Sequence, residues 1–251
     1  MTPTPSDVSA RRAEAGILLD FDGSLSEIVP VPEEAHPVDG AVDVLTALAR
    51  SFRIVAVISG RRAADVAARI GPGVRCFGLY GREDERGPIA GAAPHPDLGS
   101  IREAVEAAAA AVPGAVVESK GPHLAVHYRL ADDPDAAAEE VRARLTPVAA
   151  QHGLRLLDGR RVVELAPAGG PTKGDVVRRL AEEEGLEAVL YAGDDIADAE
   201  AFAAVGELAS RGVVGVRVAV RSGETPAELI AGADTVVDGP AGLVQLLRDL
   251  V

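Results

Sequence analysis

The chain has 251 residues, of which 47% are hydrophobic, 25% charged and 3% aromatic, so it can bury a large core and is not a wholly disordered chain. Its 25 basic and 39 acidic residues give a formal charge of −14, which argues against a general nucleic-acid binder. The single cysteine, Cys76, excludes an internal disulfide. The first 15 residues contain no apolar segment typical of a signal peptide, and no uncharged apolar stretch reaches the 18 residues of a membrane span. We therefore expect a cytoplasmic protein with neither nucleic acid nor a membrane as its partner.

The first third of the chain alternates short apolar runs with helix-like stretches. Residues 1–14 are expected to form a disordered tail. Apolar runs follow at 16–20, 53–58 and 74–79, separated by helix-like stretches at about 40–50 and 61–70. Because these runs are continuous rather than alternating, they predict strands buried on both faces.

The middle of the chain has a different pattern, which predicts a small α+β unit. A helix is expected near 97–112, strands near 115–119 and 123–130, a second helix near 134–151, and strands near 154–158 and 161–166. Proline-rich junctions lie at 94–96 and 167–171. We interpret residues 93–167 as a cap inserted into a core formed by residues 15–92 and 168–251.

The last third returns to alternating strands and helices. Helix-like stretches at 173–185, 196–205 and 240–250 are interleaved with apolar runs at 188–192, 213–220 and 235–237. The whole core is therefore predicted to be of the α/β class, with a parallel sheet and right-handed crossovers.

The first motif that carries chemistry, Asp20-Phe-Asp22-Gly-Ser-Leu, follows the first predicted strand. Ligands of open α/β sheets bind at this end of the strands. Two carboxylates two residues apart suit a shared Mg²⁺, with one group attacking phosphorus and the other moving a proton. By itself the motif also fits a strand that ends in an ordinary Asp-Gly turn.

Two further motifs come at predicted helix starts. Ser59-Gly60-Arg61 offers a hydroxyl and backbone N–H groups to an anion, although Ser59 also suits a simple N-cap. Lys173 lies at the positive end of a helix dipole and is one of only two lysines in the chain, which indicates an anionic partner.

The fourth motif, Gly-Asp194-Asp195-Ile-Ala-Asp198, places three acids after another predicted strand. Alone it also fits an N-capped helix with acids in its first turn. The four motifs occur in the order acid pair, serine, lysine, acid cluster, each at a strand end or a helix start. Together they indicate a phosphoryl-transfer site.

These motifs resemble, in order, those of the haloacid dehalogenase (HAD) superfamily of Mg²⁺-dependent phosphatases. The resemblance implies an α/β fold with an HAD-like Rossmannoid core and an inserted C2-type cap. It implies that Asp20 forms an aspartyl-phosphate, that Asp22 is the general acid and base, and that Ser59 and Lys173 hold the phosphoryl group. The Mg²⁺ ligands that it implies are Asp20, the backbone carbonyl of Asp22, and Asp194, with Asp195 and Asp198 supporting them.

The predicted cap carries charged residues suited to a polyol. Glu118 and Lys120 share one face of a strand, and Glu164 lies in the last cap strand. Carboxylates accept hydrogen bonds from sugar hydroxyls, and Lys or Arg side chains donate to them. The alternative is a set of solvated ion pairs of little energetic value.

The cap motifs Glu118-Ser-Lys120, His127-Tyr-Arg129 and Val-Glu164-Leu resemble the trehalose-6-phosphate phosphatase family, as does the segment from Tyr191 to Phe202. The likeness extends from about residue 15 to 251. It implies hydrolysis of trehalose 6-phosphate, and contacts to the glucose unit distal to the phosphate from Glu118, Lys120, Arg129 and Glu164. Further substrate contacts are expected from Gly60, Arg61 and His127, in a protein that we expect to be a monomer.

The sequence also departs from that family. Ser24 replaces a threonine, Ala197 and Ala199 replace a threonine and a glutamate, and Leu79-Tyr80-Gly81-Arg82 replaces a His-Gly pair. The last change leaves open another sugar phosphate, such as a trehalose-like pseudo-disaccharide phosphate, as the substrate. A non-catalytic sugar-phosphate-binding protein is a remote alternative, because a pure binder needs no nucleophile.

Overall fold

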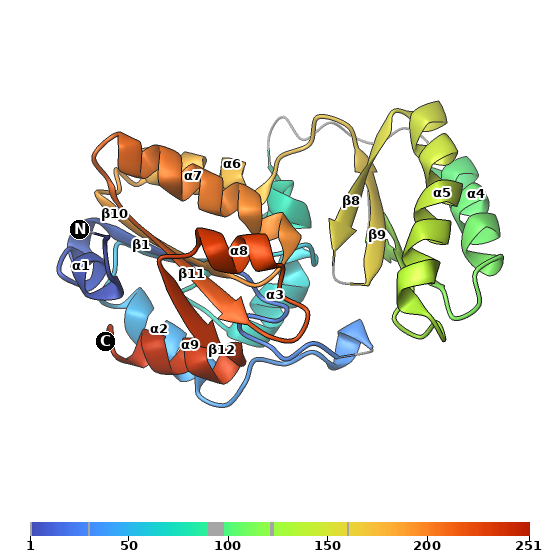
Figure 1. Ribbon diagram of the computed structural model, residues 1–251. Helices are drawn as coiled ribbons and strands as arrows, with labels where there is room; N and C mark the ends of the chain where they lie inside the picture. Colours follow the sequence, from blue (N-terminus) through green and yellow to red (C-terminus); the bar gives the residue numbers. More distant parts are fainter. Residues whose placement is uncertain (1, 30, 90–97, 121–122, 160) are drawn as a thin grey trace. The chain divides into compact units, whose positions relative to one another are not determined.

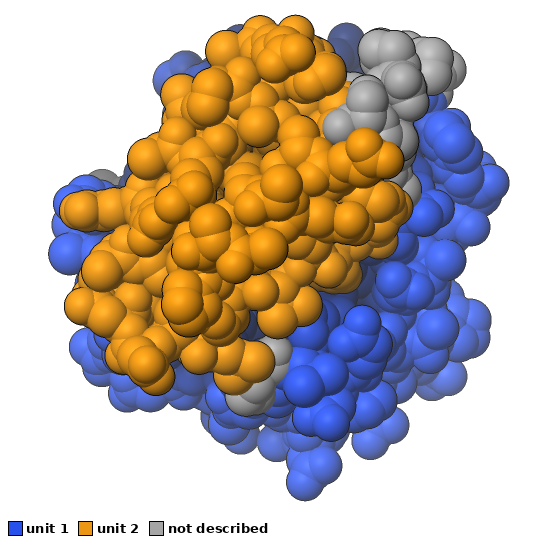
Figure 2. Space-filling model, turned by 90° about the vertical axis from the view of Figure 1, so that its right-hand side faces the viewer, with its two compact units in different colours: residues 1–89, 171–251 blue, residues 90–170 orange. Residues whose placement is uncertain are grey.

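The computed structural model describes residues 2–29, 31–89, 98–120, 123–159 and 161–251, without the side chains of residues 98–100 and 120. The chain divides into two compact units, which Figure 2 colours separately. Unit 1 contains residues 1–89 and 171–251, and unit 2 contains residues 90–170. The domain boundary predicted at 92–93 lies outside the described residues, and the second junction falls at 170–171 instead of 167–168.

Unit 1 is built on a mainly parallel sheet with the strand order β12-β11-β10-β1-β2-β3-β4-β5. Neighbouring strands from β12 to β3 run parallel, and two short strands extend the sheet in an antiparallel manner. The central strands are buried along their whole length, as their continuous apolar runs predict. The strands are β1 (Ala15–Leu19), β2 (Ile54–Ile58), β3 (Arg75–Gly78), β4 (Glu83–Asp84), β5 (Gly87–Pro88), β10 (Ala188–Gly193), β11 (Val214–Arg221) and β12 (Thr235–Asp238).

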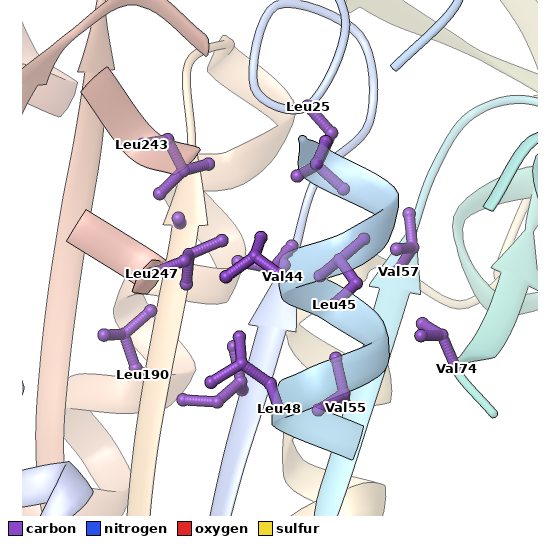
Figure 3. Packing of buried hydrophobic residues seen from close by; sticks show 14 of the residues in the cluster. Leu25, Val44, Leu45, Leu48, Val55, Val57, Val74, Leu190, Leu243 and Leu247 are labelled. Carbon is purple, nitrogen blue, oxygen red and sulfur yellow. The ribbon is translucent and has the colours of Figure 1, made fainter. Parts of the chain in front are cut away.

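Helices cover both faces of this sheet (Figure 1). On one face lie α2 (Ala41–Ala49), α3 (Ala63–Ile70) and α9 (Gly239–Arg248); on the other lie α6 (Lys173–Glu183), α7 (Ala199–Ser210) and α8 (Ala227–Gly232). Figure 3 shows Val44, Leu45 and Leu48 of α2 packed among sheet residues and α9. No helix within the described ranges is long and apolar enough to cross a membrane.

The disordered tail predicted for residues 1–14 is wrong. Residues Pro5–Ser9 form α1, which begins with a capping box between Thr4 and Asp7. Val8 is fully buried in the same core as α2 and α9. A 3₁₀ turn, Arg12–Glu14, follows, and the Arg12 guanidinium donates to the carbonyl of Leu250 at 2.6 Å. Burial of one valine and two local hydrogen-bonded turns therefore order this segment.

Unit 2 has two layers, as its repeated helix-strand-strand pattern predicts. Its antiparallel sheet has the order β6-β7-β9-β8, and the helices α4 and α5 pack against one face through a separate core. Leu124 and Val126 of β7 and Val163 and Leu165 of β9 point into that core. The elements are α4 (Leu98–Ala110), β6 (Val116–Lys120), β7 (His123–His127), α5 (Pro134–His152), β8 (Leu154–Gly159) and β9 (Val162–Pro167).

Candidate active site

The ends of three adjacent parallel strands bring the predicted core residues together. Asp20 follows β1, Ser59 follows β2 and Asp194 follows β10, and β1 lies between the other two. Parallel strands end at the same edge of a sheet, so these side chains meet there. Each of the three is at most 4% exposed, which makes this edge a buried polar centre.

Lys173 lies at the middle of this centre. Its Nζ atom donates to Asp20 Oδ1 at 2.6 Å and to Asp198 Oδ1 at 2.7 Å. A capping box between Thr172 and Asp175 starts α6 at this residue. Burial alone would lower the pKa of Lys173, but the charges and hydrogen bonds of the two carboxylates outweigh it and raise the pKa. In the structure, Asp20 and Asp198 are anionic partners of Lys173, and its contact with a phosphoryl group stays a prediction.

Three carboxylates lie close enough to share a cation. Ligand atoms of Asp20, Asp194 and Asp198 lie within 4.8 Å of one another. Burial is the main cause that raises the pKa of Asp20 to about 7, with Lys173 opposing it and Asp198 and Asp22 adding to it. Clustered buried carboxylates need positive charge, and hard oxygen donors are the ligands that Mg²⁺ prefers. The donor set therefore fits a magnesium ion.

Asp198 holds the acidic loop in place. Its Oδ2 atom accepts the backbone N–H groups of Asp194 and Asp195, each at 2.9 Å. Its Oδ1 atom accepts Lys173 and also the Tyr191 hydroxyl, at 2.6 Å. Burial, followed by the Asp198 charge, raises the pKa of Tyr191 well above its usual range. The two oxygens of Asp198 together accept four hydrogen bonds, so Asp198 is placed to orient Asp194. The sequence analysis did not assign Tyr191 to the site.

The residues after Asp22 shape the site around Asp194. Gly23 has a φ of +83°, and a Cβ atom there would overlap the Asp194 carboxylate, so both backbone and space require glycine. The Ser24 hydroxyl donates to Asp194 Oδ1 at 3.0 Å. Ser24, which stands where the resembled family has threonine, thus supplies a hydroxyl to the Asp194 carboxylate.

Arg61 contacts Asp22 through two hydrogen bonds. Its Nε and Nη2 atoms donate to the two carboxylate oxygens at 2.7 Å each, and Nη1 donates to the Pro32 carbonyl at 2.7 Å. The guanidinium carbon also lies 5.5 Å from the centre of the Phe21 ring. A bidentate pair of this kind fixes a carboxylate in position. Sequence reasoning had expected Arg61 to bind substrate and had not paired it with Asp22.

The start of α3, where an anion site is predicted, is arranged differently from that prediction. The helix begins at Ala63, and Glu83 Oε1 accepts the Ala63 N–H and the Arg62 Nε, each at 2.8 Å. A protein carboxylate thus occupies the start of this helix. The Ser59 hydroxyl accepts the Arg61 N–H at 3.1 Å, and a Cβ on Gly60 would come within 2.8 Å of the Tyr80 hydroxyl. The Ser59-Gly60 turn is therefore held by the Arg61 N–H on one side and by the Tyr80 side chain on the other.

In unit 2 the predicted sugar contacts fall on one face of the sheet. The strand register puts Glu118, Ala125 and Glu164 side by side, on the face opposite the apolar core. His127 Nε2 lies 2.7 Å from Glu118 Oε2, and His123 Nδ1 lies 2.7 Å from Glu164 Oε1. Arg129 is half-buried just after β7, and the Lys120 side chain lies outside the described part. Sequence reasoning had not paired His123 with Glu164.

Comparison with known sequences identifies the family. The model of the family described as "Trehalose-phosphatase" matches residues 18–82 and 93–230. The chain belongs to the trehalose-phosphatase family. Trehalose-phosphate phosphatases of Mycobacterium marinum and Mycobacterium avium are 37% identical over 202 residues and 36% identical over 248 residues. The matches cover 76% and 93% of this chain but only 51% and 61% of those proteins, so the chain spans about half of their length or slightly more.

Solved structures of trehalose-phosphatase family members share the fold. The C-terminal domain of the trehalose-6-phosphate phosphatase of Candida albicans superposes with a TM-score of 0.85. The match covers 100% of this chain and 98% of that one at 22% identity. This likeness confirms the predicted HAD-like α/β core with an inserted cap.

Proposed function

We propose that this chain is a Mg²⁺-dependent phosphatase that hydrolyses trehalose 6-phosphate to trehalose and phosphate. The observation that carries the proposal is the buried bridge from Lys173 to Asp20, beside Asp194. The family and the printed names of its relatives support the substrate. Because those relatives are longer than this chain, the activity of the chain itself is an inference.

The magnesium ion would be held by Asp20, by the backbone carbonyl of Asp22 and by Asp194. Asp195 and Asp198 would support these ligands, Asp198 through its bonds to the backbone of the acidic loop. When bound, the ion supplies positive charge that neutralises the carboxylates and the phosphoryl oxygens. Lys173 supplies a second positive charge at the same place.

The reaction would proceed in two displacements. First, an Asp20 oxygen bonds to phosphorus while the ester bond to the sugar oxygen breaks, and Asp22 gives that oxygen a proton. Second, a water oxygen bonds to phosphorus, the bond between phosphorus and Asp20 breaks, and Asp22 accepts the proton of the water. Ser59 and Lys173 hold the phosphoryl group through both steps.

Arg61 gives this mechanism a test of its own. If Arg61 holds Asp22 in position for the proton transfer to the leaving group, Arg61→Met should lower kcat/KM for trehalose 6-phosphate by about 10²-fold, the lower end of what general acid catalysis contributes. The value of kcat/KM for p-nitrophenyl phosphate should fall much less, because this ratio depends only on the first displacement and p-nitrophenolate departs without a proton. The ratio kcat/KM measured on both substrates tests this; equal losses in kcat/KM would contradict the role of Arg61 in positioning Asp22 as the acid.

The sugar would be recognised by unit 2. We infer that Glu118, Lys120, Arg129 and Glu164 contact the glucose unit distal to the phosphate, and that His127, Gly60 and Arg61 lie near the substrate. One polar sheet face opposite an apolar core supports this assignment. A different sugar phosphate is the second candidate substrate. The feature that favours it is Tyr80, which packs against Gly60 and lies in the segment that replaces the His-Gly pair of the family.

A substrate panel tests the proposed function. Phosphate release is measured from trehalose 6-phosphate, glucose 6-phosphate, sucrose 6-phosphate and p-nitrophenyl phosphate, with Mg²⁺ or with EDTA. We expect rapid hydrolysis of trehalose 6-phosphate that EDTA abolishes. Metal-dependent activity without this preference would support the phosphatase chemistry proposed for unit 1 and would reject trehalose 6-phosphate as the preferred substrate. If no phosphate is released from any of these compounds, the proposed phosphatase activity is rejected.

A further inference from the structure

The polar face of the unit 2 sheet has an ordered arrangement around Ala125. Ala125 of β7 pairs with Glu118 of β6 on one side and with Glu164 of β9 on the other. The two carboxylate-bearing residues are thus two strand spacings apart, about 10 Å. His123 and His127 lie two residues before and after Ala125 on the same strand, so all four polar residues share this face.

Each carboxylate is held by one imidazole of the central strand. His127 contacts Glu118 and His123 contacts Glu164, both at 2.7 Å, so the two pairs lie on opposite sides of Ala125. An ionised carboxylate only accepts hydrogen bonds, so with Glu118 and Glu164 ionised the imidazole nitrogen is the donor in each pair. The pairs differ in exposure: the side chains of His127 and Glu118 are 26% and 29% exposed, whereas those of His123 and Glu164 are 1% exposed each.

The buried pair is costly as a purely structural feature. Taking a carboxylate out of water is unfavourable, and an apolar pair of similar volume often gives equal or greater stability. The opposite face of the same strands is filled with apolar side chains, so these strands accommodate apolar side chains and could carry an apolar pair here as well. A hydrogen bond to a buried imidazole does, however, fix the orientation of the Glu164 oxygens, as a ligand-binding carboxylate requires.

We propose that His123 is a positioning residue for the sugar-binding carboxylate Glu164. It sets the selectivity for trehalose 6-phosphate over phosphates that lack the second sugar. The proposal rests on the proposed function, because it assumes that Glu164, whose side chain is 1% exposed in this structure, becomes accessible to a sugar hydroxyl when the substrate binds. His123 acts through Glu164 and needs no contact with the substrate. His127 performs the same task for Glu118, in a more exposed setting.

The experiment compares the full-length wild-type protein with His123→Leu, which cannot hydrogen-bond, and His123→Asn, which returns an N–H donor close to the Cβ atom. KM and kcat are measured for trehalose 6-phosphate and for p-nitrophenyl phosphate with Mg²⁺. His152→Gln, at the end of α5, is the matched control. We expect His123→Leu to raise KM for trehalose 6-phosphate at least about tenfold, as the loss of a hydrogen bond to a charged group allows. The aryl phosphate should react within about twofold of wild type.

Recovery of most of the affinity in His123→Asn would support the positioning role, because a purely structural defect would not be repaired selectively for one substrate. Equal losses on both substrates, or an unchanged KM for trehalose 6-phosphate, would overturn it. If His123→Leu does not fold, His123→Ser, too short to reach Glu164, decides by the same criteria. A wild-type protein that does not prefer trehalose 6-phosphate would instead reject the proposed function, and the inference with it.

Discussion

Replacing Asp20 by asparagine should abolish turnover of every phosphate ester. Asp20 is 4% exposed and accepts a hydrogen bond from Lys173 at 2.6 Å. The amide oxygen of Asp20→Asn can keep that contact, but an amide does not form an acyl phosphate under these conditions. Removal of a covalent nucleophile costs large factors, so we expect kcat to fall by at least about 10³-fold.

The loss in Asp20→Asn should be equal for trehalose 6-phosphate and p-nitrophenyl phosphate, because the nucleophile is needed whatever the leaving group. Phosphate release at saturating substrate measures it, and circular dichroism of the variant controls for folding. Ser210→Ala, an exposed change at the end of α7, is the matched control and should leave both rates unchanged. Turnover within tenfold of wild type in Asp20→Asn would contradict the aspartyl-phosphate route.

Much of the core was predictable because its signals are local. Continuous apolar runs give strands buried on both faces, and in parallel strands the residues that follow them meet at one edge. Asp20, Ser59 and Asp194 could therefore be placed together without knowing any distance. In unit 2, the helix-strand-strand pattern predicted both layers, and the alternation along β7 separates Leu124 and Val126 from His123 and His127.

The contacts between side chains far apart in the sequence could not be predicted. Arg61 pairs with Asp22 across 39 positions, and His123 pairs with Glu164 across 41. No periodicity links such residues, because their distance depends on strand register and loop paths. The same holds for Glu83, which reaches the start of α3, and for Val8, a single valine in a polar segment whose burial depends on distant helices.

Lys173 is the second residue whose replacement should have a very large effect. Its ammonium group lies between Asp20 and Asp198, 3% exposed, in a chain that otherwise uses arginine almost throughout. Removing one partner of a buried ion pair costs about 3–5 kcal/mol, because the remaining charges stay buried without compensation. Lys173→Met should therefore lower thermal stability and reduce kcat/KM by at least about 10²-fold, the loss of a charge that stabilises the transferring group.

Lys173→Arg tests whether charge alone is sufficient. Guanidinium is planar and wider than ammonium, and its forked donors do not fit between two single oxygens in a closed site. We therefore expect Lys173→Arg to lose at least about tenfold in kcat/KM, as a misplaced group in a preorganised site does. Arg144→Lys, the reverse exchange in an exposed pair on α5, is the matched control and should change nothing. Wild-type activity in Lys173→Arg would show that the site requires only a positive charge there, and the retention of lysine in this arginine-rich chain would then need another explanation.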